Sequence, residues 1–162
     1  KSQRDNLYVG VLGLEHLIKA LCEKKTPRLR MPLSDVMSTE RLLICSPNDE
    51  ADNIWHMMKE RSFAACPVVA KGKAIGIVTL QNLLESGAML PAFESKKGRF
   101  KAPSTIDTIM RTPVQSLRPS NTVGDAARLM VEMDIGRVPI VDDKGHLIGI
   151  VDREDILKAL IE

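Results

Sequence analysis

The chain has 162 residues, 44% hydrophobic and 27% charged, and is therefore long enough to bury the core of one or two globular domains. Its net charge of +2 gives no electrostatic basis for nucleic-acid binding. It has only one Trp, one Tyr and three Phe on which bases could stack, so we do not expect nucleic-acid binding. No apolar run approaches the roughly 18 residues that a membrane-spanning helix needs, so no membrane association is expected.

The first part of the chain, residues 1–33, predicts a strand and a helix followed by a linker. Tyr8–Leu21 has an apolar run around a glycine and then apolar residues at helical spacing. Cys22–Pro32 is basic, which indicates a solvated connector, with phosphate binding as the alternative. Because the first residue is not Met, we expect the chain to begin inside a longer protein or to be trimmed.

The second part, residues 34–87, predicts the element order β-α-β-β-α. Ile54, Met57 and Met58 stand at i, i+3 and i+4 and indicate the buried face of the first helix. The predicted elements are a strand at Leu42–Ile44, a helix at Asp49–Arg61, hairpin strands at Pro67–Ala70 and Ala74–Val78, and a helix at Thr79–Ser86.

Residues 88–106 show no sustained periodicity and are interpreted as a linker between two parts. Residues 107–162 then repeat the order β-α-β-β-α. The predicted elements are a strand at Pro113–Leu117, a helix at Thr122–Asp134, strands at Val138–Val141 and His146–Val151, and a helix at Asp152–Ile161.

These two parts are internal repeats, with matching landmarks 72 or 73 residues apart. Cys66–Val69 corresponds to Val138–Val141, and Gly76 corresponds to Gly149. Tyr8–Leu21 matches the end of a repeat, so it is either the tail of a further unit, which we favour, or a cap that mimics one. A single unit of about 55 residues has a marginal core, so we expect the two units to pack together.

The three cysteines, Cys22, Cys45 and Cys66, are isolated and form no Cys-x-x-Cys pair. They share no metal-ligand spacing with the three histidines. This pattern predicts a reduced, cytoplasmic setting and no metal site. Cys66 stands in an apolar run and is expected to fill the core.

The repeat resembles a tandem CBS-domain pair, also called a Bateman module, over Ser34–Glu162. The landmarks are Asp-x-Met at the opening of a unit, an apolar-Pro-Val-Val strand, and Gly-apolar-apolar-Thr/Asp-x-x-Asp at its close. The resemblance implies an α/β (α+β) fold in which two CBS units pack as a pseudo-twofold pair with two clefts. It also implies a regulatory role, in which AMP, ADP, ATP or S-adenosylmethionine binds and an attached or associated protein responds.

The resemblance places the ligand sites where the last helix of each unit begins. It implies that Asp155 binds the ribose hydroxyls, a role that a carboxylate can fill with two accepted hydrogen bonds. The first unit has Asn82 at this position and Thr79 three residues earlier. The second unit has Asp152 in place of that threonine, and Arg153 and Arg137 are expected to offset its charge and contact phosphate. The two clefts should therefore differ, with the Asp155 cleft dominant.

Each cleft is also expected to use the opening strand of a unit. The resemblance implies that an adenine is framed by Thr39 and Leu43 in one cleft and by Thr112 and Val114 in the other. Which opening strand lies beside Asp155 and which beside Asn82 stays open at this point.

The predicted function is a regulatory adenosyl-binding module that requires no cofactor and is not an enzyme, since no nucleophile–base pair, paired carboxylates or phosphate loop is present. The alternative is a structural dimerisation module with decayed ligand sites. A homodimer through the CBS helices is expected because Met57, Met58, Met130 and Met133 offer more apolar surface than one intramolecular pairing needs.

Overall fold

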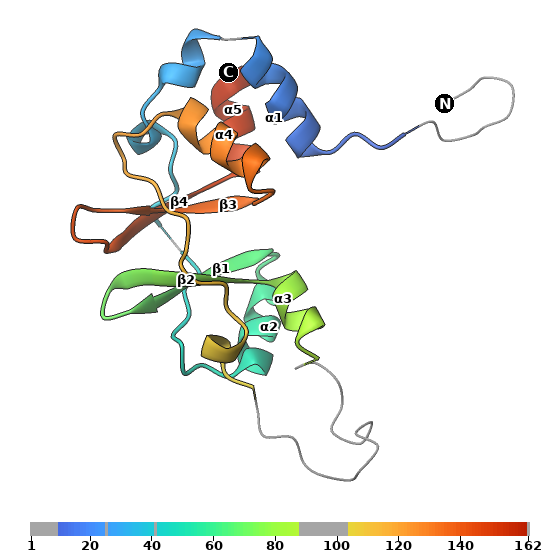
Figure 1. Ribbon diagram of the computed structural model, residues 1–162, viewed down its shortest axis with the longest axis vertical. Helices are drawn as coiled ribbons and strands as arrows, with labels where there is room; N and C mark the ends of the chain where they lie inside the picture. The colour runs from blue at the N-terminus through green and yellow to red at the C-terminus, as the bar shows by residue number, and fades with distance from the viewer. Residues whose placement is uncertain (1–9, 25, 41, 88–103, 162) are drawn as a thin grey trace, which may run out of the picture. The chain divides into compact units, whose positions relative to one another are not determined.

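The computed structural model describes residues 10–24, 26–40, 42–87 and 104–161 and divides into two compact units (Figure 1). Neither unit is one continuous stretch of chain. Unit 1 comprises Lys1–Met37, Pro119–Val138 and Val151–Glu162, and unit 2 comprises Ser38–Arg118 and Pro139–Ile150. The compact units therefore cut across the two sequence repeats.

Unit 1 is built mainly from helices, which lie side by side in Figure 1. They are α1 (Leu14–Glu23), α4 (Val123–Glu132), α5 (Arg153–Ile161) and the short 3-10 helices η1 (Pro27–Arg30) and η2 (Leu33–Asp35). Helix α1 packs on both α4 and α5 and buries Ile18 completely. On the facing helices, Met130 and Ile156 are also buried. The apolar faces of the three helices thus supply the core of this unit.

The prediction that Cys22–Pro32 is a solvated connector is therefore wrong for the described residues of this segment. Cys22 belongs to α1, and η1 packs on α4 and α5. The guanidinium of Arg28 donates a hydrogen bond to the carbonyl oxygen of Ala159, at 3.4 Å. The prediction missed this because a dense run of cations looks solvated in sequence, whereas long basic side chains can lay their stems along a packed surface.

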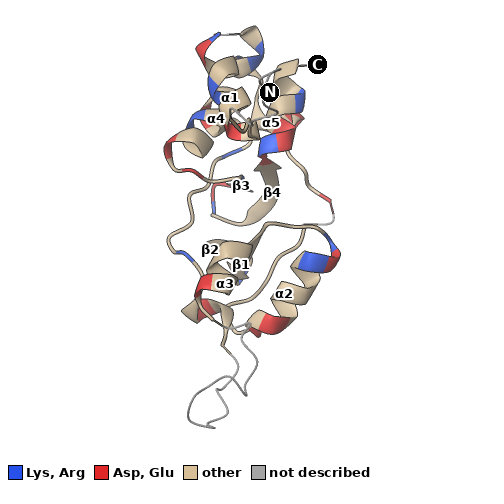
Figure 2. Cartoon of the chain, turned by 90° about the vertical axis from the view of Figure 1, so that its right-hand side faces the viewer, with Lys and Arg blue, Asp and Glu red and all other residues tan. Residues whose placement is uncertain are grey.

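Unit 2 contains the antiparallel hairpin of β1 (Ala65–Ala70) and β2 (Lys73–Thr79), with register from Ala65↔Thr79 to Ala70↔Lys73. Lys71 and Gly72 at the turn both have positive φ, the conformation that two-residue hairpins favour. Helices α2 (Ala51–Glu60) and α3 (Leu80–Glu85) lie on one side of this sheet (Figures 1 and 2). The buried core residues are Leu43, Cys45, Ala51, Ile54, Met58, Cys66, Val68, Val78, Leu83 and Ile106.

The second hairpin joins β3 (Arg137–Val141) to β4 (Leu147–Asp152), as the repeat predicts. A short 3-10 helix, η4 (Ile106–Thr108), opens the second repeat. Ile106 nevertheless lies in the core of unit 2, with residues of the first repeat. The predicted helices and hairpins of both repeats are thus confirmed, with ends that differ by one or two residues. The predicted core position of Cys66 is confirmed as well, since its exposed fraction is 0%.

The two predicted opening strands, Leu42–Ile44 and Pro113–Leu117, are wrong as regular strands. Residues 42–44 contain no bridge, and only the residue after them, Cys45, makes an isolated parallel bridge, with Val68. The second segment contains one such bridge, between Leu117 and Ile140. The first ladder stops after one residue because a turn begins at Ser46, whose N–H is bound by the Asp49 carboxylate at 2.8 Å. In the second, Pro113 has no N–H to donate to a ladder.

The strand predicted at the start of Tyr8–Leu21 falls partly outside the described residues, and the helix that follows it is confirmed as α1. Residues 10–12 form no strand. Leu12 is 70% exposed, whereas its counterparts in the repeats, Val78 and Val151, are fully buried. Those counterparts lie on strands of paired hairpins, and no described residue pairs with this segment in the same way.

The methionines that suggested self-association are less exposed than expected. Met58 and Met130 are buried within their own units, and Met57 packs against the core of unit 2. Met133 is 53% exposed. Most of the methionine surface from which we expect a homodimer is therefore already buried within the two units. The homodimer stays a prediction.

Candidate functional site

The start of α5 carries two carboxylates that cap the helix reciprocally. Asp152 Oδ1 accepts the N–H groups of Glu154 and Asp155, at 2.9 and 3.1 Å. In return, Asp155 Oδ2 accepts the N–H of Asp152 at 2.9 Å. The arrangement is that of a capping box, in which a side chain three residues into the helix returns to the residue before it. Asp155 is thus held in place by the helix that it caps.

The Asp155 carboxylate is half-buried, and its two oxygens have different surroundings. Burial raises its pKa above the ordinary value, an effect opposed by the hydrogen bond from Asp152 N–H and reinforced by the negative charge of Asp152. The Asp152 side chain also contacts this carboxyl group, which raises the pKa further, and the backbone hydrogen bond from Asp152 goes to Oδ2. A pre-positioned carboxylate oxygen of this kind can accept hydrogen bonds from hydroxyl groups of a ligand.

The two arginines expected near Asp152 are placed differently. Arg137 Nη2 lies 3.5 Å from Asp152 Oδ2, so its charge offsets that carboxylate as expected. Arg153 instead faces Asp134 Oδ1 at 3.1 Å and Glu15 Oε2 at 3.6 Å. Nothing in the local sequence indicates these partners, because Glu15 lies on α1, more than a hundred residues earlier.

The start of α3 repeats the capping box with neutral groups. Thr79 Oγ1 accepts the N–H of Asn82 at 3.1 Å, and Asn82 Oδ1 accepts the N–H and the hydroxyl of Thr79, at 3.2 and 2.9 Å. The exposed fraction of Asn82 is 7%. Because its oxygen is engaged by Thr79, Asn82 has only its amide N–H groups to offer, whereas Asp155 offers an acceptor. The two motifs therefore differ in hydrogen-bonding polarity.

The opening segments are exchanged between the repeats. In unit 2, Arg111 and Ile77 exchange backbone hydrogen bonds of 2.9 and 3.0 Å, and Thr112 Oγ1 donates to the carbonyl oxygen of Ile75 at 2.9 Å. The opening segment of the second repeat thus lies along β2, the strand that leads to Thr79. The sequence alone does not determine this pairing.

The opening segment of the first repeat pairs with β4 in the same way. Ser38 and Ile150 exchange two backbone hydrogen bonds of 2.9 Å, two residues before the strand reaches Asp152. Thr39, next to this bridge, is exposed. The side chain of Leu43 lies in the core of unit 2, with an exposed fraction of 5%, rather than on an open wall. Val114 is half-buried and Thr112 exposed on the segment that lies along β2.

Gly76 allows this close approach on β2. A Cβ at this position would lie 2.8 Å from the sulfur of Met110 and 3.0 Å from the carbonyl oxygen of Arg111. That carbonyl accepts the N–H of Ile77, so a side chain would press on the bridge itself. Repetition of this glycine in the sequence is the signal that could have revealed the contact.

We expect Gly76→Ala to lower the free energy of unfolding by about 1–3 kcal/mol, the usual cost of overpacking. Gly136→Ala is the matched control, because no heavy atom lies within 4 Å of a Cβ built there. Chemical denaturation of both variants tests this expectation. A Gly76 variant as stable as the Gly136 variant would show that the opening segment moves aside without cost.

Other classes of site find no support in the described residues. No group of three or more His, Cys, Asp and Glu side chains there could hold a metal ion. None of the helices in the described ranges has the length and apolar character needed to cross a membrane. Basic and acidic residues are interspersed on the helices (Figure 2), as on α5, where Arg153 precedes Glu154 and Asp155.

Comparison with solved structures shows the same fold in several proteins. Protein MJ1225 from Methanocaldococcus jannaschii superposes with a TM-score of 0.82 at 23% identity, covering 96% of this chain and 56% of that one. CBSX2 of Arabidopsis thaliana, solved in complex with AMP, gives a TM-score of 0.66 at 25% identity, covering 80% and 95%.

A third structure and the family comparison complete the assignment. The CBS domain pair of protein MJ0100, solved with methylthioadenosine and S-adenosyl-L-methionine, gives a TM-score of 0.64 at 25% identity, covering 79% and 98%. The chain spans 55% of the length of two curated relatives that it matches. The CBS domain profile matches residues 33–88 and 106–162, more than half of the chain. The chain therefore belongs to the CBS domain family and carries two tandem CBS domains.

Proposed function

We propose that this chain is a regulatory module that binds an adenosyl ligand and controls an attached or associated protein. The observation that carries the proposal is Asp155, a half-buried carboxylate that is fixed at the start of α5 by a backbone hydrogen bond to one of its two oxygens. The proposal is supported by the similarity to CBSX2 and MJ0100, which were solved with AMP and with S-adenosylmethionine and methylthioadenosine. The ligand class is therefore adenosine with a variable 5′ group.

The ribose and the 5′ group of such a ligand each have a proposed partner in unit 1. The ribose hydroxyls donate to Asp155, a charge-assisted interaction stronger than a neutral hydrogen bond. Arg137, held beside Asp152, attracts a 5′ phosphate, and Asp152 limits how much negative charge is tolerated there. The module acts by binding rather than by catalysis.

The asymmetry of the two motifs makes the Asp155 site the dominant one. Thr79 and Asn82 form the equivalent site, with Thr112 and Val114 on the opposing segment. Asn82 presents donors instead of a charged acceptor, so a ribose gains less there. A structural dimerisation module is the second candidate. It is favoured by the fact that Asn82, Asp152 and Arg153 all have partners within the fold.

Calorimetry with AMP, ADP, ATP, methylthioadenosine and S-adenosylmethionine separates the two candidates. A regulatory module should bind at least one of them with a stoichiometry near one per chain and gain thermal stability accordingly. Asn82→Asp should raise the stoichiometry toward two by supplying the missing acceptor. Absence of binding by all five compounds in both the parent chain and this variant would support the dimerisation module instead.

The affinity for the adenosyl ligand should also depend on pH. A ribose that donates hydrogen bonds favours the ionised carboxylate, whereas the raised pKa of Asp155 favours its protonated form before binding. Affinity is therefore fully present above the Asp155 pKa and is lost as the pH falls through it. Because this pKa is raised, the loss should begin at a higher pH than for an ordinary aspartate, whose pKa is about 3.9. Calorimetric titrations across this range check the expectation. If Asp155→Asn, which cannot ionise at this position, loses affinity over the same pH range, another group causes the pH dependence.

A further inference from the structure

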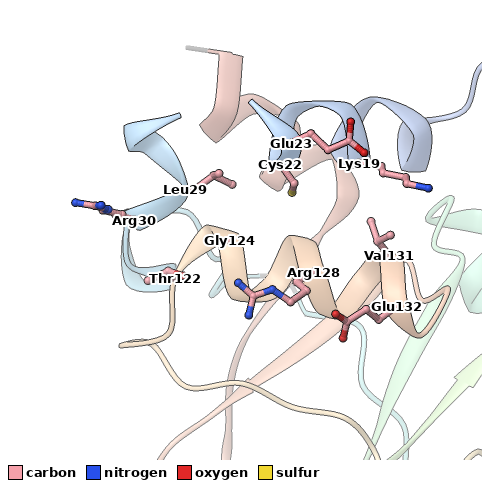
Figure 3. A pocket seen from close by; sticks show the side chains of 10 residues that line it. All are labelled: Lys19, Cys22, Glu23, Leu29, Arg30, Thr122, Gly124, Arg128, Val131 and Glu132. Atoms are coloured by element: carbon pink, nitrogen blue, oxygen red, sulfur yellow. The ribbon is translucent and has the colours of Figure 1, made fainter. Parts of the chain in front are cut away.

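A hollow of about 500 Å³ opens in unit 1 between α1, η1 and α4 (Figure 3). None of the residues that line it belongs to the motifs at Asp155 or Asn82. Its volume falls within the range of about 300–1,000 Å³ that is typical of small-molecule sites. We call it the helical pocket.

The inner surface of the helical pocket is apolar. Cys22 from α1, Leu29 from η1 and Val131 from α4 point into it (Figure 3). All three side chains are half-buried, so each leaves apolar surface uncovered. Burial is the main cause that raises the pKa of the Cys22 thiol, which therefore stays uncharged at neutral pH and behaves as a small apolar group.

The charge on the pocket wall favours an anion. Arg128 extends from α4 beside this surface (Figure 3), and its charge acts on Asp125, three residues earlier, and on Cys22, although it forms no ion pair within 4 Å with a described residue. Glu132 stands one turn further along α4, yet the two side chains do not form the ion pair that this spacing permits. Three cations and two carboxylates line the pocket in all. Figure 3 shows the Arg30 side chain directed away from it, so Arg128 is the guanidinium that lies beside the apolar surface.

We propose that the helical pocket binds a small amphipathic anion. An apolar body would cover Cys22, Leu29 and Val131, and a single carboxylate or phosphate group would pair with the Arg128 guanidinium, whose planar fork suits such groups. This site is separate from the adenosyl site and does not depend on it. Because α1 and α4 form opposite walls, an occupant stabilises the packing of α1 on unit 1.

A matched pair of fluorescent probes tests the proposal on the intact chain. Anilinonaphthalenesulfonate carries one anionic group on an aromatic body, and N-phenylnaphthylamine has the same body without the charge. Arg128→Gln should raise the Kd of the sulfonate about tenfold, the loss expected for one charge-assisted contact, and should leave the Kd of the neutral probe unchanged. Arg61→Gln, an exposed arginine at the end of α2, is the control and should change neither.

Alkylation of Cys22 locates the bound probe. Cys22 is half-exposed and Cys45 and Cys66 are buried, so maleimide should label Cys22 first. The sulfonate should slow this labelling several-fold, both with and without AMP. A Kd that Arg128→Gln leaves unchanged, or labelling that the probe does not slow, would refute the proposal. Protection of Cys22 that grows with protein concentration in the absence of probe would also refute it, because a second copy would then cover the pocket.

These outcomes are independent of those for the adenosyl site. Arg128→Gln should leave adenosyl-ligand affinity unchanged, and Asp155→Ala should leave the affinity for the sulfonate unchanged. A negative result for one site therefore does not affect the proposal for the other.

Discussion

Asp155→Ala should weaken adenosyl-ligand binding about ten- to a hundredfold. Loss of the charge-assisted interaction with the ribose should cost about 1.5–3 kcal/mol in all, which corresponds to that change in Kd. Asn82→Ala should cost less than about 1 kcal/mol at the dominant site, because Asn82 carries no charge and its oxygen is already bound by Thr79. Isothermal calorimetry on both variants measures the difference.

The capping role of Asp155 requires a control. Asp155→Ala also removes the acceptor for Asp152 N–H and so weakens the start of α5. Asp155→Asn keeps an acceptor oxygen for that bond but loses the charge, so it should retain most of the stability while still losing affinity. Affinity as high in both variants as in the parent chain would exclude a ribose role for Asp155. A larger loss of affinity in Asn82→Ala than in Asp155→Ala would show that the dominant site is the one at Asn82.

Ile18→Ala should lower the free energy of unfolding of unit 1 by about 2–5 kcal/mol, the cost of removing a large side chain from a packed core. Ile18 is fully buried where α1 packs on α4 and α5. Urea denaturation followed by circular dichroism measures the change, and hydrogen exchange of α4 and α5 locates it.

Leu17→Ala is the matched control, since Leu17 lies beside Ile18 on α1 and is 38% exposed. Its loss should be well below that of Ile18→Ala, because less apolar surface is removed from contact. Equal losses in the two variants would show that α1 does not belong to the core of unit 1. The N-terminal helix would then be an appendage of the CBS pair.

Much of the site could be predicted because its parts are local. Thr79 and Asn82, like Asp152 and Asp155, are three residues apart after an apolar strand, and this spacing by itself predicts a capping box. The hairpin turn at Lys71 and Gly72 and the buried positions of Ile54 and Met58 follow from local patterns in the same way. What could not be predicted are the partners of Arg153, Glu15 on the distant helix α1 and Asp134 just after α4.

The sequence by itself determined the tandem repeat, its β-α-β-β-α order and the unequal chemistry of Asp155 and Asn82, because these depend on residue type and on spacings within a few turns of chain. Only the tertiary structure decided that α1 packs with α4 and α5, and that the opening segment of each repeat pairs with the last strand of the other. The two repeats share the same order of elements and the same pattern of apolar strand residues, so the local pattern cannot distinguish pairing within a repeat from pairing between repeats. That choice depends on contacts between residues far apart in the chain, such as those of Arg111 with Ile77 and Ser38 with Ile150.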